Sequence, residues 1–359
     1  MKLLYVGNLT PGSRSEQRRR AFVRLGHDVD ALPYCATLRS YAERPRLSFA
    51  DRVRHRLGRP SDPMDVNGQL LRALCAARYD AVWVDKAPPL LPRTLQKAKE
   101  LSAGTVFHFH SEDNHALAHN QWTWMSACFA RYDVVWTTKK RNVELGELAA
   151  LGARDVRFHF QSFDPLEHRP LAPDPFERDH LFADAGFIGT FEAERARSLL
   201  KLADAGVFVR VFGNGWQPLV GRHALLVVHP HEIGGREYLA AMACSSVQLG
   251  FLRKQNLDEH TSRSLEIPAC GVPLVAERTK DHLALFEEGK EALFFDGDRE
   301  LVARVQDLLA HPERRRALAL AGRERCLDSG YDHESMLARC LASSMPDVDR
   351  APALLEQAA

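Results

Sequence analysis

Short apolar runs alternate with stretches of helical periodicity along the first half of the chain. The apolar runs cover residues 3–7, 81–85, 105–110 and 133–137, and each is followed within a few residues by an amphipathic stretch. A strand buried on both faces of a sheet is apolar throughout, because neither face meets water. The pattern therefore predicts a parallel α/β sheet in this half of the chain.

The same alternation starts again after a proline-rich segment. Residues 162–176 contain four prolines and show neither helical nor strand periodicity, which is typical of a linker. Beyond the linker, apolar runs cover residues 185–189, 207–213, 225–228, 247–251, 273–276 and 292–295. We predict a Rossmann-like domain at 1–165, a second at 166–331, and a C-terminal segment at 332–359. That segment could cross back to the first domain before a frayed tail.

Two doubly wound α/β domains of similar size, joined by one linker, are expected to face each other across a cleft. Sheets of this kind bind their ligands at the carboxyl ends of the strands. The functional site is therefore predicted between the two domains.

Charge and cysteine content argue against several classes of function. The 48 Lys and Arg balance the 47 Asp and Glu, and a net charge of +1 argues against a nucleic-acid partner. No apolar run approaches the ~20 residues that cross a bilayer, so we expect a cytoplasmic protein with no transmembrane segment. The seven cysteines are scattered and never have C-x-x-C spacing, which argues against disulfides and a zinc site.

The most informative segment, residues 256–279, reads NLDEHTSRSLEIPACGVPLVAERT. We predict a helix over residues 259–270, ended by Gly271, that presents Arg263 and Glu266 to the strand ends. A carboxylate can accept both hydroxyls of a ribose, so Glu266 is the candidate ribose ligand; Arg263, one turn earlier, could meet a diphosphate. Taken alone, the spacing favours Asp258 as a helix cap and Glu266 as a solvated acid; only the neighbouring motifs reverse this preference.

This segment resembles the nucleotide-sugar-binding segment of the GT-B-fold glycosyltransferases called glycosyltransferase group 1, most closely the branch similar to the spore-maturation protein CgeB. Asp258 and Glu266 hold the positions of the two acids in the family pattern, with Asp replacing the more usual first Glu. Residues 187–206, 211–216, 235–251 and 292–326 are also similar to this branch. The resemblance implies the GT-B fold, a nucleoside diphosphate sugar as donor, and no required metal or other cofactor.

Weaker donor-binding candidates surround this segment. Arg195 could meet a phosphate, although pairing with Glu192 or Glu194 is an equally good interpretation of it. Trp216 could stack on a nucleobase or belong to the core. The wider family carries an Arg and a downstream Lys here, and the Lys is not evident. The further candidates for donor binding are Gly189, Thr190, Gly213, Asn214, Arg253 and Lys254.

In the first domain, the sequence FHFHSEDNH (residues 107–115) ends a predicted strand and crowds polar side chains at the cleft edge. We predict that His110 and Asp113 are catalytic, since the family often has a catalytic-loop histidine there. A structural histidine remains an alternative, and a metal site is disfavoured because H-E-x-x-H spacing is absent. The glycine-containing loop that carries Gly7, Asn8 and Gly12 is expected to face the acceptor side of the cleft.

These features predict a glycosyltransferase of hexosyltransferase type that moves a sugar from a nucleoside diphosphate sugar, with UDP as the expected nucleotide. The acceptor is a hydroxyl of a cell-surface glycan, a protein or a small molecule, and peripheral membrane contact stays open. The resemblance favours retention of stereochemistry; inversion would make Asp113 the base. The alternative is a non-catalytic nucleotide-sugar-binding surface-layer or maturation protein. A dehydrogenase is disfavoured, because G-x-G-x-x-G does not follow the first strand.

Overall fold

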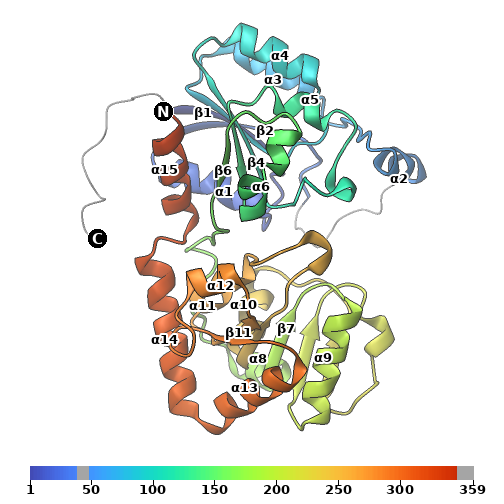
Figure 1. Ribbon diagram of the computed structural model, residues 1–359, viewed down its shortest axis with the longest axis vertical. Helices are drawn as coiled ribbons and strands as arrows, with labels where there is room; N and C mark the ends of the chain where they lie inside the picture. Colours follow the sequence, from blue (N-terminus) through green and yellow to red (C-terminus); the bar gives the residue numbers. More distant parts are fainter. Residues whose placement is uncertain (39–47, 346–359) are drawn as a thin grey trace.

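The computed structural model describes residues 1–38 and 48–345. Within these residues the strands form two parallel six-stranded sheets, ordered β2-β1-β3-β4-β5-β6 and β12-β11-β10-β7-β8-β9. The predicted α/β fold of two doubly wound domains is therefore confirmed, and Figure 1 shows the sheets in two separate lobes. The predicted frayed tail, residues 346–359, lies outside the described residues.

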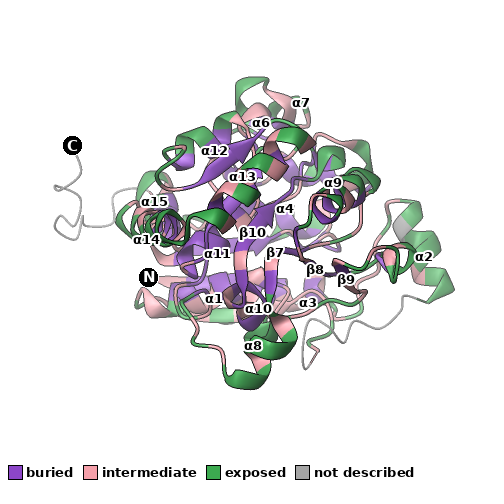
Figure 2. Ribbon diagram, turned by 90° about the horizontal axis from the view of Figure 1, so that it is seen from below, coloured by how far each residue is buried: buried purple, intermediate pink, exposed green. Residues whose placement is uncertain are grey.

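The strands of the first sheet are β1 (Lys2–Gly7), β2 (Asp28–Pro33), β3 (Ala81–Asp85), β4 (Val106–Ser111), β5 (Val134–Thr137) and β6 (Val156–Phe158). Those of the second are β7 (Ala183–Ile188), β8 (Val209–Phe212), β9 (Leu226–His229), β10 (Ser245–Gly250), β11 (Leu274–Glu277) and β12 (Leu293–Phe295). The central strands are buried along their length, and Figure 2 shows them between layers of helices whose outer faces are exposed. This burial explains why these strands are apolar runs.

The helices of the first lobe are α1 (Arg14–Arg24), α2 (Phe49–Arg56), α3 (Val66–Ala76), α4 (Pro92–Leu101), η2 (Ala118–Asn120), α5 (Met125–Phe129), α6 (Lys140–Glu144) and α7 (Glu147–Ala150). Those of the second are α8 (Pro175–Leu181), α9 (Ala193–Asp204), η3 (Gln217–Leu219), α10 (Gly235–Ala243), η4 (Lys254–Asn256), α11 (Arg263–Ala269), α12 (Lys280–Leu285), α13 (Asp298–Ala310) and α14 (Pro312–Asp328). The last helix, α15 (His333–Ser344), follows them in the chain.

The chain crosses between the lobes at two places that lie together. Phe163, in the proline-rich segment, forms a parallel bridge with Asp332, which caps α15 by accepting a hydrogen bond from the Ser335 amide at 2.8 Å. From there α15 packs on α1 of the first lobe, where Leu337 is fully buried. Figure 1 shows α14 and α15 in line along one side of both lobes.

The predicted helix over residues 259–270 is wrong at its start, because α11 begins only at Arg263. The preceding residues follow a loop with Leu257 in the left-handed region, at φ 53°. The side chains of Asn256 and Asp258 hydrogen-bond to each other at 2.6 Å, and both also contact the first lobe. These contacts hold the segment outside helical geometry. The predicted left-handed residue after the helix is confirmed, since Gly271 has a φ of 73°.

Candidate active site

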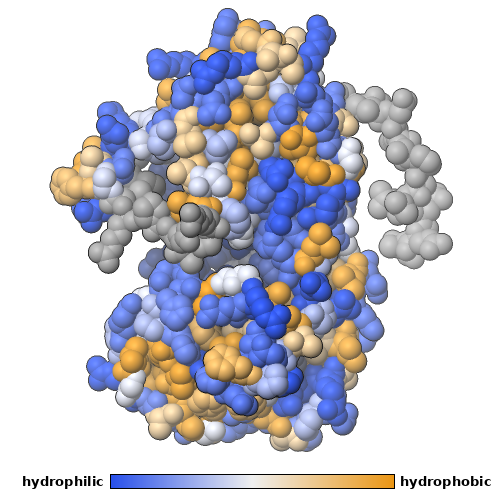
Figure 3. Space-filling view, turned by 180° about the vertical axis from the view of Figure 1, so that it is seen from behind, coloured by the Kyte–Doolittle hydropathy of each residue, from blue (hydrophilic) through white to orange (hydrophobic). Residues whose placement is uncertain are grey.

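The carboxyl ends of the two sheets face each other across a cleft, and Figure 3 shows the surface hollowed between the two lobes. The loop before α11 contacts the first lobe at several points. Lys139, after β5, pairs with Asp258 at 2.5 Å, and the amide of Asn114 donates to Asn256 Oδ1 at 3.2 Å. Lys140 adds an ion pair with Asp281 at 3.0 Å. The segment that the sequence singled out thus contacts the first domain.

Glu266 lies in this region as a buried and ionised carboxylate. Its Oε2 atom accepts a hydrogen bond from the Tyr238 hydroxyl at 2.6 Å, and its Oε1 atom lies 3.8 Å from His168 Nε2. Burial alone would raise the pKa of Glu266. The positive charges of His168, Arg263 and Arg14 outweigh burial and lower this pKa to about 2. The carboxylate is therefore available as a hydrogen-bond acceptor at any physiological pH.

Arg263 is close enough to Glu266 and to Arg195 to lower the pKa of both. Its Nε atom is buried and has no hydrogen-bond partner among the described residues. A buried guanidinium nitrogen without a partner is costly, unless a ligand supplies the acceptor. Arg263 shares this feature with Arg195 and other arginines, and an anionic ligand such as a diphosphate at Arg263 stays a prediction.

The two loops that follow β7 and β8 pack tightly against each other. The amide of Phe191 donates to the Asn214 carbonyl at 2.9 Å, and Gly213 has a φ of 145° with its α-carbon facing the Gly189 carbonyl. The indole of Trp216 donates to the same Gly189 carbonyl at 2.7 Å, and this side chain is fully buried. Trp216 is therefore a core residue that fixes the loop, as the alternative interpretation proposed. Thr190 and Asn214 are exposed at the rim.

Arg195 faces this loop from inside. Its Nη1 atom donates to the Thr190 carbonyl at 2.9 Å, its Nη2 atom lies 3.3 Å from Glu192, and only 6% of the residue is exposed. Burial lowers the pKa of Arg195. The predicted pairing with Glu192 is confirmed, whereas the Nε atom of Arg195 is buried without a partner among the described residues, so its phosphate role stays a prediction.

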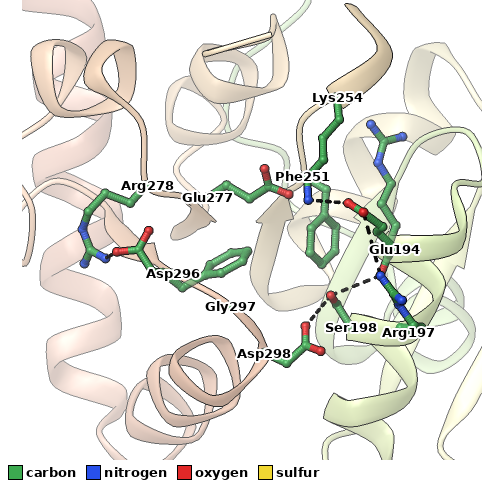
Figure 4. Close-up of a pocket in the computed structure, with 12 residues that line it drawn as sticks. Glu194, Arg197, Ser198, Phe251, Lys254, Glu277, Arg278, Asp296, Gly297 and Asp298 are labelled. Carbon is green, nitrogen blue, oxygen red and sulfur yellow. Dashed lines mark hydrogen bonds and ion pairs between the residues drawn. The ribbon is translucent and has the colours of Figure 1, made fainter. Parts of the chain in front are cut away.

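Arg253 and Lys254 are both more than half exposed. Arg253 lies 3.7 Å from Glu192, and Lys254 pairs with Glu194. Lys254 and Arg195 also line a cavity of about 310 Å³ between the first turns of α9 and α13, drawn in Figure 4. Its lining charges are largely paired with one another, and the lining includes neither Glu266 nor Arg263. Arg253 does not line this cavity, and the donor-binding roles of Arg253 and Lys254 stay predictions.

His110 lies inside the first domain rather than on the cleft surface. The residue is fully buried, and its ring stacks on His159 at a centroid distance of 5.1 Å. Its Nδ1 atom is 3.4 Å from Asp85, and its Nε2 atom has no partner among the described residues. Asp85 in turn accepts from Arg18 at 2.7 Å. His110 is thus held among buried side chains, and its catalytic role stays a prediction.

Asp113 lies at the cleft edge with 35% of its side chain exposed, and it pairs with Lys86. Burial would raise the pKa of Asp113, but Lys86 lowers it, which makes the carboxylate a weak base. Lys86 itself is in the left-handed region at φ 68°, followed by Ala87 at φ 35°. Two consecutive strained residues that are not glycine are typical of functional sites.

The predicted acceptor loop follows β1 and is rigid. The Asn8 side chain accepts from the Thr10 amide at 3.0 Å, and its carbonyl accepts from the Ser13 hydroxyl at 2.8 Å. Gly12 is exposed and has a φ of 81°. At Gly7, a side chain would collide with Ser15 and Tyr5. The loop ends at Arg14, whose guanidinium reaches across the cleft to Ser262.

The described residues contain no group of three or more His, Cys, Asp or Glu that could hold a metal ion. In the same part of the chain, no helix has the length and apolar character needed to cross a membrane.

Residues 195–342 match a family model described as glycosyl transferase-like. No curated protein matches the chain. Among solved structures, an alpha-glucosyltransferase in complex with UDP and a 13-mer DNA containing an HMU base superposes with a TM-score of 0.67 at 14% identity. That match covers 96% of this chain and 99% of the other. The chain therefore has the GT-B fold, and residues 195–342 are similar to glycosyl transferase-like proteins.

Two other solved structures also match nearly the whole chain. Anabaena HepE in complex with UDP matches with a TM-score of 0.60 at 13% identity, covering 96% of this chain and 100% of the other. Sucrose-phosphate synthase from Thermosynechococcus elongatus matches with a TM-score of 0.61 at 16% identity, covering 96% and 98%. These findings confirm the GT-B fold and support the prediction of a glycosyltransferase. The closer resemblance to the CgeB-like branch is not confirmed.

Several residues of this GT-B cleft were not found from the sequence. Arg14, Lys139 and Lys86 come from the first domain, and Tyr238 and His168 hold Glu266. Their positions depend on how the lobes meet. The one local signal was that Lys139 and Lys86 closely follow a strand, at the end where such sheets bind ligands.

Proposed function

We propose that the protein transfers a sugar from a nucleoside diphosphate sugar to an acceptor hydroxyl. The observation that carries this proposal is the pair of Glu266 and Arg263: an ionised, buried carboxylate next to a guanidinium nitrogen with no partner among the described residues. A ribose offers two hydroxyl donors and its diphosphate offers acceptors, which complements this pair. HepE and the alpha-glucosyltransferase were both solved with UDP, which supports UDP as the nucleotide.

The proposal assigns roles around this pair. Glu266 holds the ribose, and Arg263 with Arg253 holds the diphosphate. The packed loops at Gly189 and Gly213, with Thr190 and Asn214 at their rim, form a rigid wall for the nucleotide. By the family resemblance, Asp258 belongs to the donor-binding residues. Its ion pair with Lys139 brings a first-domain cation to the same place.

Retention of stereochemistry suits this cleft better than inversion. Inversion needs a free base to take the acceptor proton, whereas Asp113 is paired with Lys86 and His110 is fully buried. In the retaining reaction the bond from the sugar carbon to the phosphate oxygen breaks, and a bond to the acceptor oxygen forms. The acceptor proton then passes to the departing phosphate, so no protein base is required.

The acceptor is proposed to bind beside the first domain, between the loop of Gly7, Asn8 and Gly12 and the edge that carries Asp113. A net charge of +1 argues against a nucleic-acid acceptor for this chain. The class of hydroxyl and a cytoplasmic location stay predictions.

The test of donor binding is the Glu266→Gln variant, with Glu259→Gln as the matched control on the same segment, where the side chain is exposed. The parent is titrated calorimetrically with UDP, GDP and dTDP. For whichever diphosphate binds, Glu266→Gln is expected to weaken binding by ~1 to 3 kcal/mol, the scale of charge-assisted hydrogen bonds. Glu259→Gln should bind like the parent. Equal affinity of Glu266→Gln and the parent would contradict the ribose role.

A second candidate, a nucleotide-sugar-binding protein without turnover, is favoured by one observation: both predicted catalytic groups are already engaged, His110 in the core and Asp113 with Lys86. Hydrolysis of a panel of UDP-, GDP- and dTDP-sugars separates the candidates. We expect slow release of the nucleoside diphosphate from one donor. Tight binding with no release, with or without candidate acceptors, would favour the binder.

A further inference from the structure

Arg14 is a cation that the first domain places in the donor half of the cleft. It is the first residue of α1, whose start is fixed by Ser13, the side chain of which accepts from the Glu16 amide at 3.2 Å. The Arg14 guanidinium donates through Nη1 to Ser262 of the second domain, 248 residues away, and its Nη2 atom lies 2.6 Å from Glu112. One side chain thus joins the two lobes.

The Ser262 contact places this guanidinium beside the proposed donor ligands. Ser262 directly precedes Arg263, and Glu266 follows one helical turn later. Arg14 is also close enough to Glu266 to be among the charges that lower the pKa of this carboxyl. A diphosphate attached to a ribose at Glu266 would pass Arg263 and then reach Arg14.

The side chain of Arg14 is more exposed than that of Arg18, the next arginine on the same face of α1, and its charge is less fully paired. Arg18 is only 5% exposed and binds both Asp85 and Glu112, so its charge is fully used inside the domain. Arg14 keeps 37% of its side chain exposed, and its contact to the second domain is a neutral hydroxyl. A phosphate oxygen is a stronger partner for a guanidinium than a serine hydroxyl.

We propose that Arg14 contacts the diphosphate of the donor, so that the acceptor-binding domain contributes a residue to donor binding and to stabilisation of the departing nucleoside diphosphate. This inference rests on the proposed function. A leaving group that carries negative charge is stabilised most by such preorganised cations.

The experiment compares Arg14→Gln and Arg14→Lys with Arg19→Gln. Arg19 lies on the same helix and bonds only to Glu16 among the described residues, at 2.7 and 2.8 Å, so it serves as the matched control. The probes are UDP and uridine, or the corresponding pair if GDP or dTDP binds the parent best. Arg14→Gln should weaken binding of the diphosphate about 10- to 100-fold, because the diphosphate carries the charge that Arg14 meets. The affinity for the uncharged nucleoside should stay within about twofold of the parent. Arg14→Lys should recover part of the loss, and Arg19→Gln should bind like the parent.

Two results would overturn the proposal. An equal loss of diphosphate and nucleoside would show that Arg14 only holds the lobes together, and unchanged diphosphate affinity would show that it does not reach the ligand. Arg263→Ala separates this failure from failure of the proposed function. If Arg263→Ala loses the diphosphate selectively while Arg14→Gln does not, the donor site stands without Arg14. If the parent binds no nucleoside diphosphate, both proposals fall.

Discussion

The candidate site depends on the negative charge of one buried side chain, that of Glu266. Glu266 is only 5% exposed, and an isolated carboxylate at that depth would be neutral or strongly destabilising. Here Tyr238 donates to it, and nearby positive charges stabilise its ionised form. The same features that make the carboxylate a ready ligand also make it part of the stability of the fold.

Acid sensitivity follows from this pKa. The folded-state pKa of Glu266 is about 2 against an ordinary value of 4.5, so its stabilisation is complete above about pH 5 and is lost as the pH falls toward 2. Between pH 7 and pH 3 the parent should lose about 2 kcal/mol more unfolding free energy than Glu266→Gln, which has no such group. Urea unfolding of both proteins at the two pH values measures this. Glu259→Gln is the control, and its unfolding free energy should change with pH as that of the parent does. If Glu266→Gln lost as much unfolding free energy as the parent between the two pH values, the assigned pKa would be wrong.

At the scale of elements, two loop-to-loop contacts build the wall of the donor site. The turn after β8 lies against the turn after β7 so closely that Gly213 leaves no room for a side chain next to the Gly189 carbonyl. Trp216 then bonds to that carbonyl from the core. A rigid wall of this kind preorganises the nucleotide site.

The variant Gly213→Ala tests the close contact between these two loops, and Gly221→Ala is its control. Both glycines have positive φ, but a β-carbon at Gly213 would collide with the Gly189 carbonyl, whereas at Gly221 it would meet open space. Gly221→Ala should therefore cost about 1 kcal/mol of stability from backbone strain alone, and Gly213→Ala more than about 2 kcal/mol. Chemical denaturation gives both values. Similar losses for the two variants would mean that the loops can separate without cost.

The sequence predicted most central strands, because strands buried on both faces are apolar runs. It missed β2, where Asp28 and Asp30 face solvent at the sheet edge, and β6, which has only three residues. Within the site, Glu266 and Arg263 come from one short segment and were found by their spacing. Arg14 and Lys139 could not be found in this way, because their partners lie more than a hundred residues away in the other domain.

In the whole molecule, the two passages of the chain between the lobes lie side by side. The Phe163 amide donates to the Tyr331 carbonyl at 3.3 Å, and the His333 amide donates to the Phe163 carbonyl at 2.8 Å, so both crossings of the chain are paired. Paired crossings restrain twisting more than a single linker does. Hinge closure of the cleft is therefore expected to bend the molecule about this point.

Stability of the first lobe depends on α15. Leu337 is fully buried in a cluster with Leu3, Tyr5 and Trp83 of the first sheet. Leu337→Ala should cost about 2 to 5 kcal/mol, as other buried leucines do, whereas Leu327→Ala on α14, where 43% of the residue is exposed, should cost less than about 1 kcal/mol. Thermal denaturation and limited proteolysis measure the difference. Equal melting temperatures for the two variants would show that α15 rests on the first lobe without stabilising it.

The path of α15 also has a consequence for how the protein is made. Residues 333–344 are synthesised after the whole second sheet, yet they cover apolar side chains of β1, β3 and β5 in the first. During translation the early half of the protein therefore emerges with part of its core uncovered, and contacts between Leu3 and Leu341 form last. Nascent chains that end before α15 should bind chaperones that recognise exposed apolar surface, and release from them should coincide with the appearance of this helix.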